Sequence, residues 1–304
     1  MEAARRPDAA NRGFAFGFIG ILAFSLTLPA TRLAVPELGS TVVGLGRALV
    51  AALLAGILLL VLRERPPPRR YWPGLAVVAV GVVIGFPLFS ALALQYVPAA
   101  HGAVFVGLLP AATAVMAVLR AGEHPPRAFW LAVAAGVVAV LLFAAAEGAG
   151  RPQPADALLL IAMLFAALGY AEGGRLSREM GGWRVICWAL LLSAPFLAVP
   201  VSIAITRDGL SAGRDAWLGF AYVAVISMFL GFFAWYRGLA LGGVALVGQM
   251  QLIQPVLTLI WSALLLGESI GPLTVLASLL VIGSVALTRL TWSASRGNTR
   301  RLPA

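Results

Sequence analysis

Two stretches of the chain share one pattern: PAATAVMAVLRAGE at Pro110–Glu123 and PVLTLIWSALLLGE at Pro255–Glu268. Each begins with proline, continues as an apolar run and ends in Gly-Glu, and they lie 145 residues apart (110 to 255). At the same separation, the segment at 93–96 matches the segment at 238–241. Matches at a fixed separation indicate an internal duplication, so we expect two copies of one structural unit.

The composition indicates a protein embedded in lipid. The chain has 304 residues, of which 61% are hydrophobic and 11% are charged, and its mean hydropathy is +0.95. Soluble domains hold roughly 45–50% apolar and about 25% charged residues. A polypeptide in lipid must satisfy its backbone hydrogen bonds internally, so we expect an all-α integral membrane protein.

Apolar runs long enough to cross a bilayer, which takes about 20 residues, predict ten transmembrane helices. They cover approximately 14–33, 41–62, 72–96, 99–119, 127–146, 156–175, 184–205, 216–236, 244–266 and 272–291. The predicted domains are a tail at 1–13, a five-helix repeat at 14–146, a second five-helix repeat at 155–291, and a tail at 292–304.

The distribution of arginine predicts how the chain is oriented in the membrane. The net charge is +10 and all 22 basic residues are arginine. Seventeen fall in segments on the same side as the N-terminus and four on the other side, which predicts that both termini are cytoplasmic. The arginines lie between apolar runs, so orientation in a membrane explains them better than a nucleic-acid partner. Because each repeat has an odd number of spans, the two copies should be inverted relative to each other.

The residues that repeat also suggest a family. The Pro, apolar run, Gly-Glu pattern of the fourth and ninth spans, the Ala- and Leu-rich ends of the third and eighth, and Leu45-Gly46-Arg47-Ala48 in the second resemble the EamA-type branch of the drug/metabolite transporter superfamily. Length and layout are also similar to YddG-like aromatic amino acid exporters. The resemblance implies a multi-pass protein of the bacterial cytoplasmic (inner) membrane, with a central cavity that opens to one side at a time.

The paired prolines are candidate hinges. Pro110 and Pro255 interrupt helical hydrogen bonding, and each would free a carbonyl four residues earlier, at Val106 and Gln251. Such carbonyls can face a substrate cavity. A kink that only improves packing is the alternative.

Three further residues are candidate gating groups. Glu123 and Glu268 precede prolines, so each should mark the start of the next helix, where a carboxylate is stabilised. The alternative is a gate, with Glu123 inside and Glu268 outside. His101 lies near the outer surface and is a weaker candidate for gating or proton sensing.

Polar side chains inside apolar spans are candidate substrate ligands. Gln249, Gln251 and Gln254 should face the protein interior, because amides facing lipid are costly. They could hold the carboxylate or the ammonium of an amino acid, or form interhelical hydrogen bonds. Arg47 lies roughly 9 Å inside its span, so we expect it to reach a wet cavity or an acidic partner such as Glu37.

Aromatic residues could accept an apolar side chain in the same cavity, with core or lipid packing as the alternative. The candidates are Phe89, Tyr96, Phe105, Trp235, Phe24 and Tyr170.

The chain lacks the patterns of enzymes. No Walker loop, HExxH, GxSxG or metal-spaced Cys/His cluster occurs, and Cys187 is the one cysteine. We therefore expect no enzyme activity, catalytic residue, cofactor or metal. We expect no span to carry an aspartate, and no glutamate to lie in the middle of a span. A carboxylate that could relay protons at mid-membrane is therefore not evident.

The sequence thus predicts an exporter of small metabolites, most of all amino acids with aromatic or apolar side chains, working by alternating access. Alternatives are export of drugs or another metabolite, import, and an intramembrane enzyme. The expected partners are membrane lipids and a small-molecule substrate. The oligomeric state stays open, and a monomer would suffice.

The predicted topology can be tested with tags. Reporters fused to the two termini should both lie in the cytoplasm, while a tag in the segment 147–154 should lie outside. Termini on opposite faces of the membrane would contradict an even number of spans.

Overall fold

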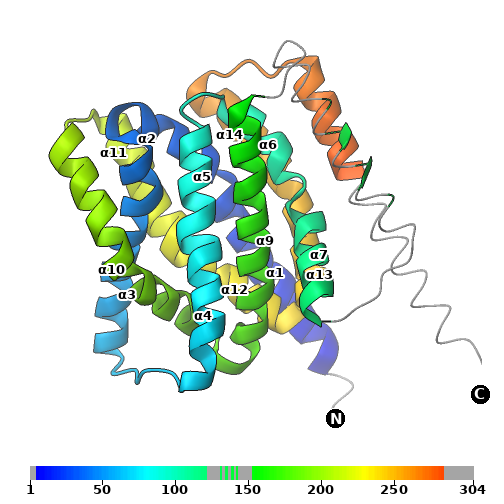
Figure 1. Cartoon of the computed structure of the whole chain (residues 1–304). Coiled ribbons are helices and arrows are strands. Elements are labelled where there is room, and N and C mark those ends of the chain that lie inside the picture. Colours follow the sequence, from blue (N-terminus) through cyan, green and yellow to red (C-terminus); the bar gives the residue numbers. More distant parts are fainter. Residues whose placement is uncertain are drawn as a thin grey trace, which may run out of the picture.

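The computed structural model describes residues 5–121 and 153–283, together with 131, 134, 135, 138, 139 and 142. In that part of the chain every regular element is a helix, as predicted (Figure 1). The first half contains α1 (Arg5–Ser25), α2 (Thr27–Thr41), η1 (Val42–Gly46), α3 (Arg47–Val61), η2 (Arg69–Tyr71), α4 (Trp72–Val78), η3 (Ala79–Gly85), α5 (Phe86–Ala93), α6 (Ala99–Val106) and α7 (Leu109–Ala121).

The second half follows the same plan. It contains α9 (Pro154–Met180), α10 (Gly182–Asp208), α11 (Arg214–Ala221), η4 (Tyr222–Leu230), α12 (Gly231–Gly242), α13 (Val244–Val247), η5 (Gly248–Ile253), α14 (Gln254–Leu266) and a helix at Pro272–Gly283. Of the predicted fifth span the structure describes 131, 134, 135, 138, 139 and 142, and the end of the tenth span lies outside the described residues.

Five described helical stretches are long and apolar enough to cross a membrane: Asn11–Val61, Arg69–Ala93, Pro154–Met180, Gly182–Asp208 and Arg214–Gly242. The first has 51 residues, more than one crossing needs. Gly39 divides it, because its φ of 74° and ψ of 155° lie outside the helical region. Gly181, with φ of 86°, separates α9 from α10. Glycine adopts positive φ without the steric cost of a Cβ, so these two positions let the chain reverse.

The halves pack on each other reciprocally. α1 lies along α12, and α9 lies along α4, η3 and α5. Thus the first span of each half contacts the third span of the other. α3 packs on α10, and α6 packs on α14, so second spans and fourth spans also meet. This exchange of equivalent contacts is the pattern expected of a duplicated unit.

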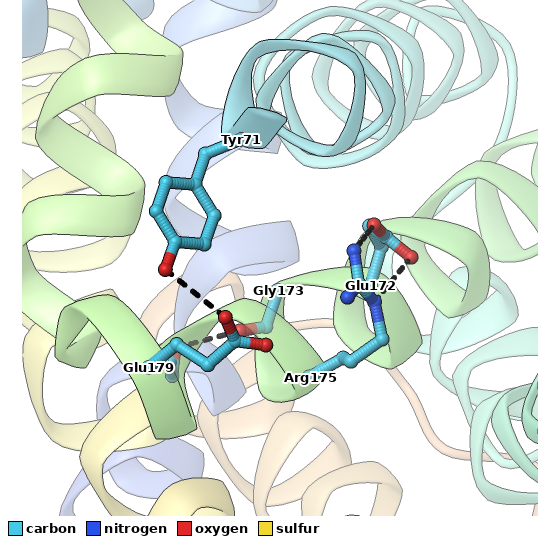
Figure 2. Close-up of polar contacts among 6 residues, drawn as sticks. Tyr71, Glu172, Gly173, Arg175 and Glu179 are labelled. Carbon is cyan, nitrogen blue, oxygen red and sulfur yellow. Dashed lines mark hydrogen bonds and ion pairs between the residues drawn. The ribbon is translucent and has the colours of Figure 1, made fainter. Parts of the chain in front are cut away.

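At the end of the bundle near the N-terminus, the segment that joins α3 to α4 bonds to the adjoining ends of α9 and α10. The Arg184 guanidinium donates to Glu64, with Nη2 2.5 Å from Oε1. The Tyr71 hydroxyl donates to Glu179 Oε2 at 3.0 Å (Figure 2). The segment between α3 and α4 holds Arg63, Arg65, Arg69 and Arg70, and it lies on the side that the arginine count predicts to be cytoplasmic.

A second set of contacts joins the opposite ends of the helices. Arg32 Nη1 donates to the Leu94 carbonyl at 2.6 Å. The Gly213 N–H donates to Glu37 Oε2 at 2.5 Å. Segments predicted to lie on one side of the membrane therefore contact segments predicted to lie on that same side.

Glycines allow the closest helix crossing. A Cβ added to Gly13 would lie 2.7 Å from the backbone nitrogen of Gly242, and one added to Gly238 would lie 2.7 Å from that of Gly17. α1 and α12 therefore meet backbone to backbone, which is how small residues four apart drive helix association in lipid.

Glycines also allow close contact where η3 crosses α9, the equivalent pair of spans. A Cβ on Gly81 of η3 would lie 2.7 Å from the Phe165 carbonyl oxygen and 2.9 Å from Gly169 Cα. Small residues therefore set the closest approach of the helices at both crossings.

Gly238→Ala should destabilise the protein, because a methyl group has no space between α1 and α12. Overpacking of this kind costs about 1–3 kcal/mol. Gly56→Ala is the matched control, since its Cβ would meet only Leu191 Cδ2 at an ordinary 3.5 Å. Thermal unfolding in detergent should show a lower Tm for Gly238→Ala alone; equal Tm values would contradict the close crossing.

Candidate functional site

A small pocket lies between the two halves, in the interior of the helical bundle. Helices α1, α2, α3, η3, α5 and α7 of the first half and α9, η4, α12 and α14 of the second contribute to its wall. The lining residues are Phe24, Thr27, Arg47, Val82, Phe86, Leu109, Tyr170, Ser227, Met228, Phe232 and Gln254.

Irregular helical backbone surrounds this pocket. Three stretches have π-helical hydrogen bonding: η1 ends immediately before Arg47, η3 contains Val82, and η4 contains Ser227 and Met228. η3 and η4 occupy matching places in the two halves. Such segments are rare and often mark functional sites. The sequence analysis missed them, because no residue pattern in the apolar runs signals them.

Both paired prolines lie where a helix begins. α6 ends at Val106, and Pro110 is the second residue of α7. Pro255 is the second residue of α14 and follows the 3₁₀ segment η5. Each therefore follows an interruption and does not kink the middle of a regular helix. The expectation that Pro255 frees the Gln251 carbonyl is wrong, because that oxygen accepts the N–H of Gln254 within the 3₁₀ turn.

Arg47 is the one charged side chain among the lining residues. It is 1% exposed, and its Nε, Nη1 and Nη2 atoms have no hydrogen-bond partner among the described residues. The alternative that Glu37 pairs with it is wrong, since Glu37 bonds the Gly213 N–H. The position of Arg47 in the pocket wall supports the other expectation, that this side chain reaches a wet cavity.

The glutamines differ in position. Gln254 lines the pocket, and its Oε1 has no described partner. Gln251 is fully buried with both amide atoms unpartnered in the described structure, and it is not a lining residue. The side chain of Gln249 lies outside the described part.

Hydroxyl groups from the two halves meet at the pocket. Thr27 Oγ1 and Ser227 Oγ are 2.8 Å apart and form a hydrogen bond. Near them, Thr258 donates to the Ser25 carbonyl at 2.8 Å. The Thr258 bond satisfies the Ser25 carbonyl at the interruption between α1 and α2, where no water from the bilayer core could do so.

An aromatic cluster forms one side of the pocket. Phe24 and Phe232 have ring centroids 4.9 Å apart, and Phe24 and Tyr170 stack at 6.1 Å. Trp235 lies behind them, fully buried and 5.5 Å from Tyr170. Of the six aromatic candidates, Phe24 and Tyr170 line the pocket, and Phe232 was not among the candidates.

The structure does not bring the remaining aromatic candidates to the pocket. Phe89 stacks on Phe165 at 5.5 Å. Phe105 stacks on His101, also at 5.5 Å. Tyr96 is 72% exposed beyond the end of α5. These three residues are not among those that line it.

A buried hydrogen-bonded pair lies at the end of the bundle away from the N-terminus. His101 Nε2 is 2.7 Å from Asp156 Oδ1, and the two side chains are 6% and 5% exposed. The expectation that no span carries an aspartate is wrong, because Asp156 lies in the first turn of α9. Its Oδ2 accepts the Gln153 N–H at 2.7 Å in a capping box. The spacing Gln153-x-x-Asp156 before an apolar run was the available signal.

Glu268 bonds the same turn of α6. Its Oε1 and Oε2 accept the N–H groups of Ala99 and Ala100, each at 2.8 Å. It was expected to mark the start of the helix that follows it, and it instead caps the N-terminus of α6 in the other half. A carboxylate there is favoured by the helix dipole. Glu123 lies outside the described residues.

Among the described residues, no three His, Cys, Asp or Glu side chains lie together as metal ligands would. Near the end of α9, the Arg175 guanidinium donates to Glu172, with Nη2 and Oε1 2.6 Å apart (Figure 2).

Comparisons with known proteins agree on the class. The profile of the EamA-like transporter family matches residues 11–145 and again 153–290. The chain is 50% identical over 280 residues to "Uncharacterized transporter YdeK" of Bacillus subtilis (strain 168), covering 92% of this chain and 97% of that protein.

Two more distant matches add detail. A "Probable terminal-alkyne amino-acid exporter" of Streptantibioticus cattleyicolor is 23% identical over 270 residues, and the match covers 88% of this chain and 90% of that protein. A crystal structure of another protein superposes with a TM-score of 0.64 at 20% identity, over 93% of this chain and 98% of that one. At that identity the likeness concerns the fold alone.

Glu268→Gln should loosen the start of α6, because the substitution removes the negative charge and one of two acceptors. Losing a helix cap costs about 1 kcal/mol, which raises the equilibrium constant for opening the first turn of α6 by a factor of about five. The readout is the labelling rate of Ala100→Cys by a membrane-impermeant maleimide, which should rise by about that factor. The native Cys187 is buried and should give little background.

Glu64→Gln is the control for that experiment, because Glu64 bonds Arg184 at the opposite end of the bundle. It should leave the labelling rate of Ala100→Cys unchanged. Equal labelling in Glu268→Gln and the unsubstituted background would show that the carboxylate does not hold α6.

Proposed function

This chain belongs to the EamA-like transporter family, and we propose that it exports amino acids with aromatic or apolar side chains through the pocket between its halves. The chain is a multi-pass membrane transporter and not an enzyme. The observation that carries the proposal is the pocket itself: it is lined by both halves and combines aromatic rings with a buried cation and an amide.

The printed name of one relative supports the substrate class. A protein that is similar over most of the chain is described as a probable terminal-alkyne amino-acid exporter. An amino acid offers a carboxylate, an ammonium and a side chain. The pocket offers donors on Arg47, an acceptor on Gln254, and the rings of Phe24 and Phe232.

The proposed architecture has ten spans as two inverted repeats, with both termini cytoplasmic in a bacterial inner membrane. The two family matches support the duplication. The reciprocal packing of the halves and the hydrogen bonds between them at each end of the bundle support the inversion. Bacterial relatives and the arginine distribution support the membrane and the orientation.

Transport by alternating access requires the halves to separate at one end at a time. The prolines Pro110 and Pro255 follow helix interruptions beside the pocket, which suits them as hinges. At the end away from the N-terminus, Glu268 and Asp156 of the second half hold α6 of the first. We propose that these bonds, including that of His101, break when this end opens, and that Glu123 gates the other end.

Other candidates have supporting places in this proposal. Trp235 backs the aromatic wall, and Gln251 lies one 3₁₀ turn before Gln254. Gln249 belongs to the same segment. Phe89, Phe105 and Tyr96 would contact substrate only in a conformation different from this one.

The test is export from proteoliposomes that contain the purified protein and labelled phenylalanine or leucine. Tyr170→Ala and Gln254→Ala should each slow transport at least severalfold, since each removes part of the pocket wall. Tyr96→Ala is the matched control, because that ring is exposed and outside the pocket. If the unsubstituted protein moves no amino acid faster than empty vesicles do, the proposed function is wrong.

A further inference from the structure

We propose that Arg47 binds a carboxylate of the transported molecule, and that this carboxylate, not an ammonium group, is what the pocket requires. The inference rests on the proposed function and names the charge that its substrate must carry. It places organic anions with an aromatic or apolar body, such as aryl-alkyl carboxylates, among the substrates together with amino acids.

The first observation is the state of the guanidinium. Arginine presents N–H donors in a planar fork that matches the two oxygens of a carboxylate. All three nitrogens of Arg47 are buried and lack a hydrogen-bond partner in the described structure. A buried charge without a partner is costly, so a residue of this kind is expected to meet an anion at some stage of its cycle.

The second observation concerns the acidic residues that might have neutralised Arg47. Those of the described interior have other partners: Glu172 bonds Arg175, Asp156 bonds His101, and Glu268 caps α6. The described titratable group close enough to interact with Arg47 is the phenol of Tyr170. The protein therefore supplies a cation to the pocket, and a ligand supplies the anion.

The third observation is the position of Arg47. It begins α3 directly after the π-helical segment η1, and its neighbours in the wall include Phe86, Phe232 and Met228. A carboxylate bound there would place the rest of the molecule among rings and a thioether, which accept apolar groups of varied shape.

An ammonium group finds a weaker site. No carboxylate lines the described pocket, and the unpaired acceptor is Gln254 Oε1, a neutral amide oxygen. An amino acid can use this acceptor, so its ammonium is tolerated. A molecule that has the ammonium but no carboxylate would bring a second positive charge beside Arg47, and that repulsion should exclude it.

The experiment measures binding of four probes to the purified full-length protein in detergent: L-phenylalanine, 3-phenylpropionate, the neutral 3-phenylpropanamide and phenethylamine. These probes share a phenyl ring and differ in charge. We expect the two carboxylates to bind, the amide to bind about ten- to a hundredfold more weakly, and phenethylamine to bind weakest, because a hydrogen bond to a charged group is worth that much. Equal binding of 3-phenylpropionate and its amide would overturn the proposal, as would no binding of either carboxylate.

Substitutions then assign the effect to one residue. Arg47→Gln should weaken the carboxylates about ten- to a hundredfold and leave the amide unchanged, and Arg47→Lys should retain part of the affinity as a single point charge. Arg207→Gln removes an equal charge from an exposed site and should change nothing. Equal weakening of all four probes by Arg47→Gln would show a role in packing alone. The comparison of probes on the unsubstituted protein holds even if that variant does not fold.

The same probes in proteoliposomes separate this inference from the proposed function. Transport that does not depend on probe charge or on Arg47 would refute the inference and leave transport standing. Arg47-dependent binding of carboxylates without any transport would refute the proposed function and leave the anion site standing.

Discussion

The structure depends on one constraint: backbone N–H and C=O groups in hydrocarbon have no water to bond, so helices must stay regular wherever they face lipid. The departures η1, η3, η4 and η5 occur beside residues that line the pocket between the halves. There, the Thr258 hydroxyl donates to the Ser25 carbonyl, a bond that a lipid-facing surface would lack. The irregular backbone and the pocket therefore occur in the same part of the fold.

The glycine crossings make that place possible. Where α1 meets α12 and η3 meets α9, backbones touch, so these pairs of helices, each with one member from either half, are held without long side chains between them. The larger side chains that line the pocket, Phe24, Phe86, Tyr170 and Phe232, lie in the same four spans. At the second crossing the glycines directly precede two lining residues, Val82 and Tyr170, so close backbone contact and the pocket wall lie side by side.

Much of this could be predicted from the sequence because its signals are local. Apolar length determines where helices can cross a membrane, and the repeated Pro, apolar run, Gly-Glu pattern indicates the duplication. A charge or amide in an apolar run is costly towards lipid, which is why Arg47, Gln251 and Gln254 were correctly expected inside. Which interior surface a residue reaches depends on rotation and on neighbours far away in the chain. That is why Phe89, Phe105 and Tyr96 were not separable from Phe24 and Tyr170, and why the partners of Asp156 and Glu268 were missed.

The contacts at the start of α6 have a kinetic consequence. Glu268 and Asp156 bond three consecutive residues, Ala99, Ala100 and His101, within a single helical turn. Breaking one bond leaves the others holding the turn, so partial release gains little solvent access and the bonds must be lost together. In the proposed transport cycle, these bonds would therefore form and break as one unit, and a partly open state would be short-lived. Such a carrier would not pass through a state open at both ends, and the membrane would keep its ion gradients during transport.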